Sequence, residues 1–305
     1  MAVAEELTPL YVNKTPSGIT IEFFSDPRHY RIDGVTVPSV TEILDALFKD
    51  LSWWGQETGV RGIEELWRKG LLNRAHPSGE LAIMHPTENV WTLATFDLLI
   101  EQLKLQKLTT SYVVGRASDR GQAAHDALEA WAVTREIPSA ENYPPDQQAY
   151  IRAVRSFCEH CDEVFLADAI EIVVGSAKHA FAGRYDVRGR FLRDITLDGF
   201  SVRKDGSAPL QPQNRQKVEI AEGTSVMLDL KTSKGVYPSH LLQLAGYEGA
   251  GQECGYSETD RRFVLHATMH GVYELVEAKA TYEQFLVVRR TWEVLQACKE
   301  ALARG

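Results

Sequence analysis

A short apolar run that ends in two charged residues constrains the fold of this chain more than any other stretch. Residues 226–228 are Val, Met and Leu, and the pair Asp229 and Lys231 follows directly. Such a run is typical of a strand buried inside a sheet. Because alternate residues of a strand point to the same side, Asp229 and Lys231 share one face. The stretch therefore predicts a carboxylate and an amine held together at the end of a buried strand.

The order of the remaining patterns predicts an α/β fold with a mixed central sheet flanked by helices. Helical periodicity marks residues 62–69, 92–105, 114–131, 146–161, 238–250 and 281–302. Strand patterns occur at residues 164–174, 179–191, 225–231, 262–268 and 272–277. The polar segment at 192–223 interrupts this order and is interpreted as an insertion or an extended hairpin. Residues 113–305 are thus expected to form the core, ending in a long C-terminal helix.

Residues 1–112 are expected to form a separate, mainly helical region with a short hairpin at 20–37. Ser39 can cap the helix that follows, since Glu42 stands three residues later. Four tryptophans occur farther along, at Trp53, Trp54, Trp67 and Trp91. They are interpreted as the aromatic core of a helical subdomain. The alternative is that one or two of these rings stack on the bases of a single strand.

Composition narrows the functional classes. The chain has 305 residues, 44% of them hydrophobic and 25% charged, as in an ordinary globular protein. A net charge of −9 argues against a protein that coats nucleic acid with its whole surface, but it permits a local basic groove. No apolar run approaches the roughly 20 residues that span a bilayer. No secretory signal is readable either, so we expect a cytoplasmic protein without a membrane partner.

Other polar residues join Asp229 and Lys231 as candidates for chemistry. Asp186 ends a strand-like run after Gly183, and His125 lies on a helix rich in small residues. Gln243 and Tyr247 are four residues apart and share one helix face. Carboxylates hold hard divalent cations, neutral imidazole suits Mn²⁺, and an ammonium steadies a reacting phosphate. Taken singly, each signal is weak, because an Asp and a Lys two residues apart are common and most helical histidines are bystanders.

Together these motifs resemble the RecB-like branch of the PD-(D/E)XK nuclease superfamily. The four motifs are Gly121 with His125, Gly183 with Asp186, Asp229 with Lys231, and Gln243 with Tyr247. Their order is similar to that in CRISPR-associated and phage RecB-type exonucleases. The segment at 38–41 is also similar to the mitochondrial genome-maintenance exonuclease of that branch. The resemblance covers about residues 115–250 and implies a restriction-endonuclease-like fold.

The resemblance also implies roles for particular residues. His125, Asp186, Asp229 and the Leu230 carbonyl would bind Mg²⁺ or Mn²⁺, and Lys231 would orient or activate the attacking water. Gln243 and Tyr247 would contact the DNA backbone or hold Lys231 in place. Glu171 is either a further acid of the site or a solvated strand residue. Several basic residues either line a phosphate-binding groove or are ordinary solvated side chains: Arg116, Arg120, Lys178, Arg184 and Lys234.

Two features depart from the family pattern. The gap between Asp186 and Asp229 is longer than is usual there, and residues 192–223 account for the excess. Several relatives carry an iron–sulfur cluster, but the cysteines here do not match its spacing: Cys158, Cys161, Cys254 and Cys298. Because Cys158 and Cys161 fall inside a predicted helix with no second such pair, incidental thiols are expected and an iron–sulfur cluster is not.

The expected function is a metal-dependent DNA nuclease, most simply an exonuclease acting on single-stranded DNA or duplex ends. It would serve DNA recombination, repair or replication, alongside protein partners of that machinery, in a bacterial or phage-infected cell. One alternative is a non-catalytic DNA-binding or assembly subunit that keeps the fold. Another is a nuclease acting on RNA or structured junctions. A helicase–nuclease is disfavoured, because the phosphate-binding motif of such ATPases does not occur in the sequence.

Overall fold

A computed structural model describes residues 8–26, 28–47, 52–73, 80–198 and 217–304, without side-chain detail at 52–55. The chain divides into two compact units. The larger comprises Met1–Leu47 with Arg120–Gly305, and the smaller is Phe48–Asp119. This division differs from the expected boundary after residue 112, because the first strands pack their apolar side chains into the core of the larger unit.

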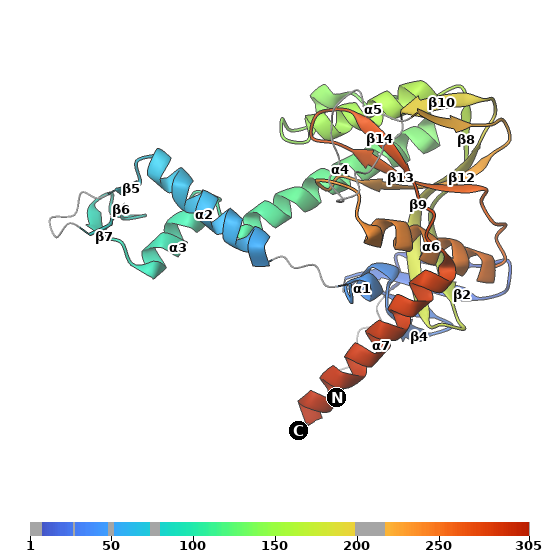
Figure 1. Ribbon diagram of the computed structural model, residues 1–305, viewed down its shortest axis with the longest axis horizontal. Coiled ribbons are helices and arrows are strands. Elements are labelled where there is room, and N and C mark those ends of the chain that lie inside the picture. Colours follow the sequence, from blue (N-terminus) through green and yellow to red (C-terminus); the bar gives the residue numbers. More distant parts are fainter. Residues whose placement is uncertain (1–7, 27, 48–51, 74–79, 199–216, 305) are drawn as a thin grey trace. The chain divides into compact units, whose positions relative to one another are not determined.

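The larger unit is built on a five-stranded sheet in the order β14-β13-β12-β9-β8 (Figure 1). The strands are β8 (Phe165–Ser176), β9 (Phe181–Phe191), β12 (Ser225–Lys231), β13 (Arg261–Ala267) and β14 (Tyr273–Glu277). β12 and β13 run parallel, and the other neighbours are antiparallel. The mixed sheet with flanking helices confirms the α/β class.

Helices cover both faces of this sheet (Figure 1). They are α4 (Thr110–Thr134), α5 (Gln148–Cys161), α6 (Pro238–Glu253) and α7 (Tyr282–Arg304). Alternate residues of β12 enter different cores: Leu228 and Leu230 pack with α4 and α5, whereas Met227 packs with α6 and α7. Apolar residues on both faces explain why this strand reads as a continuous apolar run.

A second, four-stranded sheet precedes these elements. It contains β1 (Tyr11–Lys14), β2 (Thr20–Ser25), β3 (Arg28–Ile32) and β4 (Val35–Val37), in that order. The sequence predicted only one short hairpin here, because its outer strands are short and partly exposed. Next comes α1 (Val40–Leu44), where Ser39 Oγ accepts a hydrogen bond from Glu42 N at 3.0 Å, as expected of the cap. Ala182 N donates to Pro38 O at 3.0 Å and pins the start of α1 to β9.

The smaller unit contains three short strands that the sequence did not predict, besides its helices. Its helices are α2 (Ser52–Arg68) and α3 (Phe96–Leu105), and its strands are β5 (Leu72–Asn73), β6 (Ala82–Met84) and β7 (Trp91–Leu93). Its core joins Leu66, Leu72, Ile83 and Leu103. Trp67 and Trp91 are 49% and 42% exposed, so the expectation that they form an aromatic core is wrong. The side chains of Trp53 and Trp54 lie outside the described part.

The segment expected to be an insertion contains a short antiparallel hairpin of β10 (Ile195–Asp198) and β11 (Lys217–Ile220). Residues 199–216 between them lie outside the described part. A 3-10 turn, η1 (Ala140–Asn142), precedes α5. Cys158 and Cys161 are buried in α5, as free thiols. Among the described helices, none combines the length and apolarity needed to cross a membrane.

Candidate metal-binding pocket

Asp229 and Lys231 meet at the end of β12, as predicted. The Lys231 ammonium contacts Asp229 Oδ2, and the carboxylate is only 1% exposed. Burial raises the pKa of Asp229 to about 6, although Lys231 opposes the shift. Lys231 is the partner of Asp229 Oδ2, and the described residues offer this buried oxygen no further hydrogen-bond donor. A buried oxygen of this kind is costly unless a cation compensates it, and Lys231 alone does so only in part.

His125 and Asp186 form an ion pair beside this end of β12. His125 Nδ1 lies 3.2 Å from Asp186 Oδ2, and the same oxygen accepts a hydrogen bond from Leu230 N at 2.7 Å. Burial works against the charged form of Asp186, but His125, Lys231 and the Leu230 amide outweigh it and lower the pKa of Asp186. Burial likewise opposes the charged His125, while Asp186 raises the pKa of the imidazole above its ordinary value. The Leu230 amide therefore contacts the site, and metal binding by its carbonyl stays a prediction.

Glu171 is the third group that comes close. Its φ of 53° is unusual for a residue within a strand, here β8, and turns the backbone locally. Glu171 Oε2 lies 2.5 Å from Arg184 Nε. Burial and the neighbouring Asp186 raise the pKa of Glu171 to about 7, against the effect of Arg184. Ligand atoms of His125, Glu171 and Asp186 all lie within 4.8 Å of one another. The structure thus favours Glu171 as an acid of the site over a solvated strand residue.

Of the two glycines in the predicted motifs, Gly183 is required for a close approach, whereas Gly121 has room for a Cβ. A Cβ at Gly183 would overlap the Tyr247 ring, so only glycine lets α6 pack on β9 there. A Cβ at Gly121 would lie 3.4 Å from Thr232 Oγ1, at the start of the loop after β12. On α6, Gln243 Nε2 donates to Tyr247 Oη at 2.7 Å, and both side chains are buried.

These side chains line one pocket of about 390 Å³. Its predicted members are His125, Glu171, Arg184, Asp186, Asp229, Lys231, Gln243 and Tyr247. Others were not predicted as site residues: Tyr11, Arg28, Thr41, Gln122, Asp126 and Glu129. Helical spacing from His125 could have found Gln122 and Glu129. Tyr11 and Arg28 come from the N-terminal sheet, and no local pattern links them to the site.

The predicted arginines separate into three environments. Arg184 lines the pocket, where its guanidinium stacks on Tyr11 and Phe23 at 5.7 and 5.4 Å from the ring centroids. Arg120 lies 3.8 Å from Asp146 and faces the Tyr150 ring. Arg116 belongs to the smaller unit, where it lines a surface hollow with Lys104, Tyr112 and Asp119. Of the three, only Arg184 is brought to the carboxylates.

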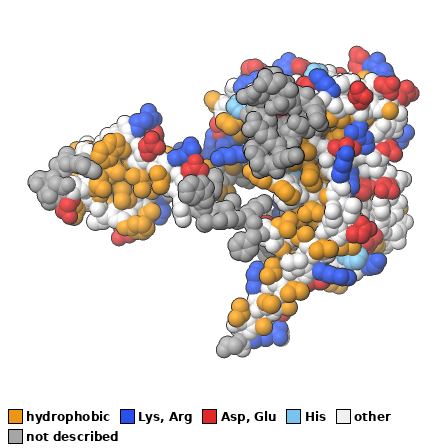
Figure 2. Space-filling view, viewed as in Figure 1, with side chains coloured by type: hydrophobic (Ala, Val, Ile, Leu, Met, Phe, Trp, Pro, Cys, Tyr) orange, Lys and Arg blue, Asp and Glu red, His pale blue; other side chains and the backbone are white. Residues whose placement is uncertain are grey.

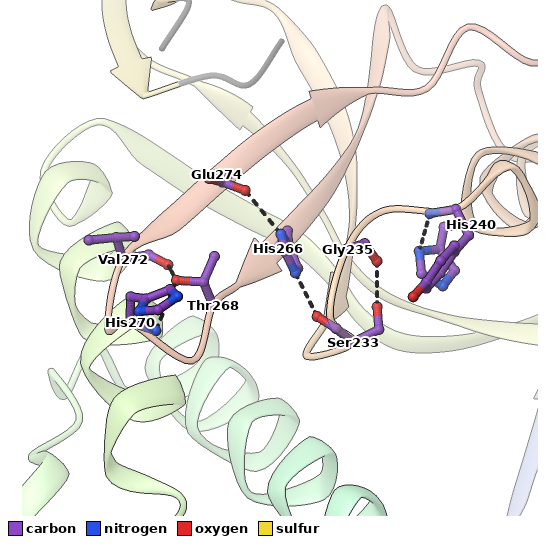
Figure 3. Close-up of polar contacts among 9 residues, drawn as sticks. Ser233, Gly235, His240, His266, Thr268, His270, Val272 and Glu274 are labelled. Atoms are coloured by element: carbon purple, nitrogen blue, oxygen red, sulfur yellow. Dashed lines mark hydrogen bonds and ion pairs between the residues drawn. The ribbon is translucent and has the colours of Figure 1, made fainter. Parts of the chain in front are cut away.

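A second histidine–carboxylate pair, His266 with Glu274, joins the neighbouring strands β13 and β14 (Figure 3). His266 is the neighbour of Lys231 in the parallel pairing of β12 with β13. His266 Nδ1 is 3.1 Å from Glu274 Oε2, and Nε2 is 2.8 Å from the Ser233 carbonyl oxygen. Because a carbonyl only accepts, His266 Nε2 is the donor of the hydrogen bond to Ser233. The pair therefore holds the backbone just after Lys231.

The donor set fits a hard divalent cation. Two carboxylates and an imidazole converge, and the buried Asp229 carboxylate, paired with Lys231, lines the same pocket. Comparison with known proteins adds no family: no family model matches the chain, and no curated protein is significantly similar to it. Function is therefore inferred from the pocket and from the motifs that build it.

Proposed function

We propose that this protein is a metal-dependent deoxyribonuclease with a restriction-endonuclease-like core of the RecB-like type. It would hydrolyse phosphodiester bonds of DNA, acting as an exonuclease on single strands or duplex ends. The observation that carries the proposal is the convergence of His125, Glu171 and Asp186 within 4.8 Å of one another in a pocket also lined by Lys231. Most of the residues that the four motifs name line this one pocket.

The proposed cofactor is Mg²⁺ or Mn²⁺. When bound, such a cation makes water a better nucleophile near neutral pH and offsets charge on the reacting phosphate. His125, Asp186 and Glu171 are the donors that would hold it, with Asp229 beside them. Without a cation, Glu171 and Asp229 bind protons more readily than ordinary carboxyl groups, since their pKa values are about 7 and about 6. Cation binding near neutral pH would therefore displace protons from these groups.

The other side chains have distinct tasks. Lys231, held against Asp229, places its ammonium in the pocket, where it can donate to a phosphate oxygen or orient the attacking water. The buried, hydrogen-bonded side chains of Gln243 and Tyr247 form part of the pocket wall beside Lys231. Arg28 from the N-terminal sheet and Arg184 from β9 put positive charge on one side of the pocket, and Tyr11 adds an aromatic ring there. Phosphate and base contacts are both available on that side.

End-labelled DNA tests the proposal directly. Single-stranded and duplex DNA, with an RNA strand in parallel, would be incubated with Mg²⁺, Mn²⁺ or EDTA. We expect cleavage of DNA only with metal, and a loss of at least about a thousandfold in Asp229→Ala and Lys231→Ala. Lys279→Ala is the matched control. The Lys279 side chain is 82% exposed, and the residue lies outside all four motifs in the sequence.

Specific outcomes would contradict the proposal. If Asp229→Ala and Lys231→Ala degrade DNA as fast as the parent, the pocket is not the site of cleavage. Binding of DNA without cleavage or specific Mn²⁺ uptake would point to a non-catalytic DNA-binding subunit. Preferential cleavage of the RNA strand would keep the chemistry but change the substrate.

A further inference from the structure

A second hollow of the larger unit lies between the tip of the β8–β9 hairpin and α7. Its volume is about 190 Å³. The side chains around it are mostly basic: Lys178, His179, Arg289 and Arg290, with Leu286 and Glu293. In the sequence Lys178 stands more than a hundred residues before Arg289, and only the fold brings them together. In Figure 2, Lys, Arg and His side chains lie among hydrophobic ones along α7.

Arg289 is the fixed centre of this hollow. The residue is only 6% exposed, and its guanidinium faces the Trp292 ring at 5.1 Å from the centroid. Nη2 donates to the Ala180 carbonyl at 3.3 Å, and Nη1 lies 2.8 Å from Glu293 Oε1. Nε is buried and has no hydrogen-bond partner among the described residues. A guanidinium held in this way has a fixed position beside the hollow.

Positive charge exceeds negative charge around Arg289. Lys178 and Arg290 are exposed, and neither has an ion-pair partner in the described part of the chain. Glu293 is the acid that lines the hollow, and it is engaged by Arg289. His179 lies 3.9 Å from Glu253 and packs edge-on against Tyr282, so its ring is held in place. The local sign is therefore opposite to the net charge of −9 of the whole chain.

We propose that this hollow binds a phosphate group. Arg289 supplies the buried anchor, and Lys178 and Arg290 supply the exposed cations that draw the anion in. The phosphate could come from the backbone of a nucleic acid strand or from a free phosphate or mononucleotide, because the recognising chemistry is the same. The strand is the source we favour, and that choice rests on the proposed function.

The position of the hollow suits a strand that also reaches the metal-binding pocket. β9 starts at Phe181, next to the hollow, and carries Arg184 and Asp186 of the pocket. Six residues from Ala180 to Asp186 span about 20 Å along an extended strand. A chain of several nucleotides bridges this distance, whereas a dinucleotide does not. Occupancy of both sites would hold the substrate during successive cleavages.

Fluorescence anisotropy with labelled single-stranded DNA in EDTA tests this site without any cleavage. The double variant Lys178→Ala/Arg290→Ala should weaken binding by about tenfold and flatten its salt dependence by about 0.7 for each phosphate that is no longer neutralised. The effect should be larger with long strands, which can occupy both sites at once, than with dinucleotides. Lys299→Ala/Arg304→Ala removes equal charge from exposed residues, both on α7, and should bind as the parent does. Melting curves check that both variants fold.

Inorganic phosphate, followed by phosphorus NMR, forms the second arm. Binding of phosphate that depends on Lys178 and Arg290, without any effect on strand affinity, would support the site and assign it to a free anion. Equal behaviour of the two double variants with both probes would overturn the inference. Because neither arm needs metal or turnover, this result is separate from the cleavage assay with Asp229→Ala that decides the proposed function.

Discussion

Two histidine–carboxylate pairs of nearly equal length lie in the larger unit. His125 Nδ1 is 3.2 Å from Asp186 Oδ2, and His266 Nδ1 is 3.1 Å from Glu274 Oε2. The side chains of the first pair are 28% and 13% exposed and line the pocket, whereas both side chains of the second are 5% exposed. The second ring nitrogen of His266 is bound to the Ser233 carbonyl.

The difference shows that the pair itself does not define a function. Where both ring nitrogens and the carboxylate are enclosed, the pair acts as a brace, here for the backbone after Lys231. Where the pair opens onto a hollow shared with further carboxylates, its lone pairs are available to a cation once the proton is displaced. The same two kinds of side chain are thus a structural tie in one place and a proposed ligand set in the other.

The largest expected effect separates the pairs by metal binding. Asp186→Asn should lower the affinity for Mn²⁺ at least about a hundredfold, because it removes a charged oxygen from the donor set. Glu274→Gln, an equally conservative change in the enclosed pair, should leave the affinity within about tenfold of the parent. Isothermal titration calorimetry measures both. If both variants lose affinity for Mn²⁺ to a similar extent, the proposed distinction between a ligand set and a structural brace is wrong.

The free energy of unfolding should rank the two pairs in the opposite order, with the larger loss for the His266–Glu274 pair. His266→Ala removes one partner of an enclosed pair and should cost about 3 kcal/mol of unfolding free energy. His125→Ala removes a partly exposed partner whose carboxylate keeps the Leu230 amide, and should cost no more than about 1 kcal/mol. Urea unfolding followed by fluorescence, without metal, gives both values. His266→Gln, which can still donate to the Ser233 carbonyl, should recover part of the stability.

The pH dependence of stability gives the smallest effect. The pKa of Asp229 is raised to about 6, so the folded metal-free protein binds more protons than the unfolded chain between about pH 4 and pH 6. Stability therefore falls as pH rises through this window. Asp229→Asn should remove the part of that fall that Asp229 contributes. Unfolding at pH 4 and pH 8 without metal tests this. Parallel curves for parent and variant would show that Asp229 is not held in a perturbed state.

Local patterns predicted the parts of the site that single elements define. The apolar strand that ends in Asp229 and Lys231 needs only alternation along β12. Gln243 and Tyr247 need only helical spacing, and the structure finds them hydrogen-bonded at 2.7 Å. The cap at Ser39 is likewise a short-range feature. Each was predictable because the forces that fix it act within a few residues.

Long-range features were not predictable in the same way. Tyr11 and Arg28 reach the pocket because the N-terminal sheet packs on β8 and β9, and no periodicity encodes that docking. In β8 the pairing register shifts between Ala167 and Ala169, and Glu171 takes a positive φ. Alternation along a strand cannot foresee which way such a residue points. The strands of the smaller unit were also not predicted. The residues of a strand as short as β7 resemble the start of a helix.

The unusual backbone of Glu171 has a consequence for how this protein tolerates change. A non-glycine residue at a φ of 53° costs about 1 kcal/mol or more, and the raised pKa adds the cost of burying a carboxylate. Replacing Glu171 by glycine would remove both the backbone cost and the cost of burying the carboxylate. Selection for heat resistance alone would therefore tend to discard Glu171, whereas selection for a working pocket would retain it. Selecting variants for heat resistance in one experiment and for activity in another would show whether Glu171 is kept for stability or for the pocket.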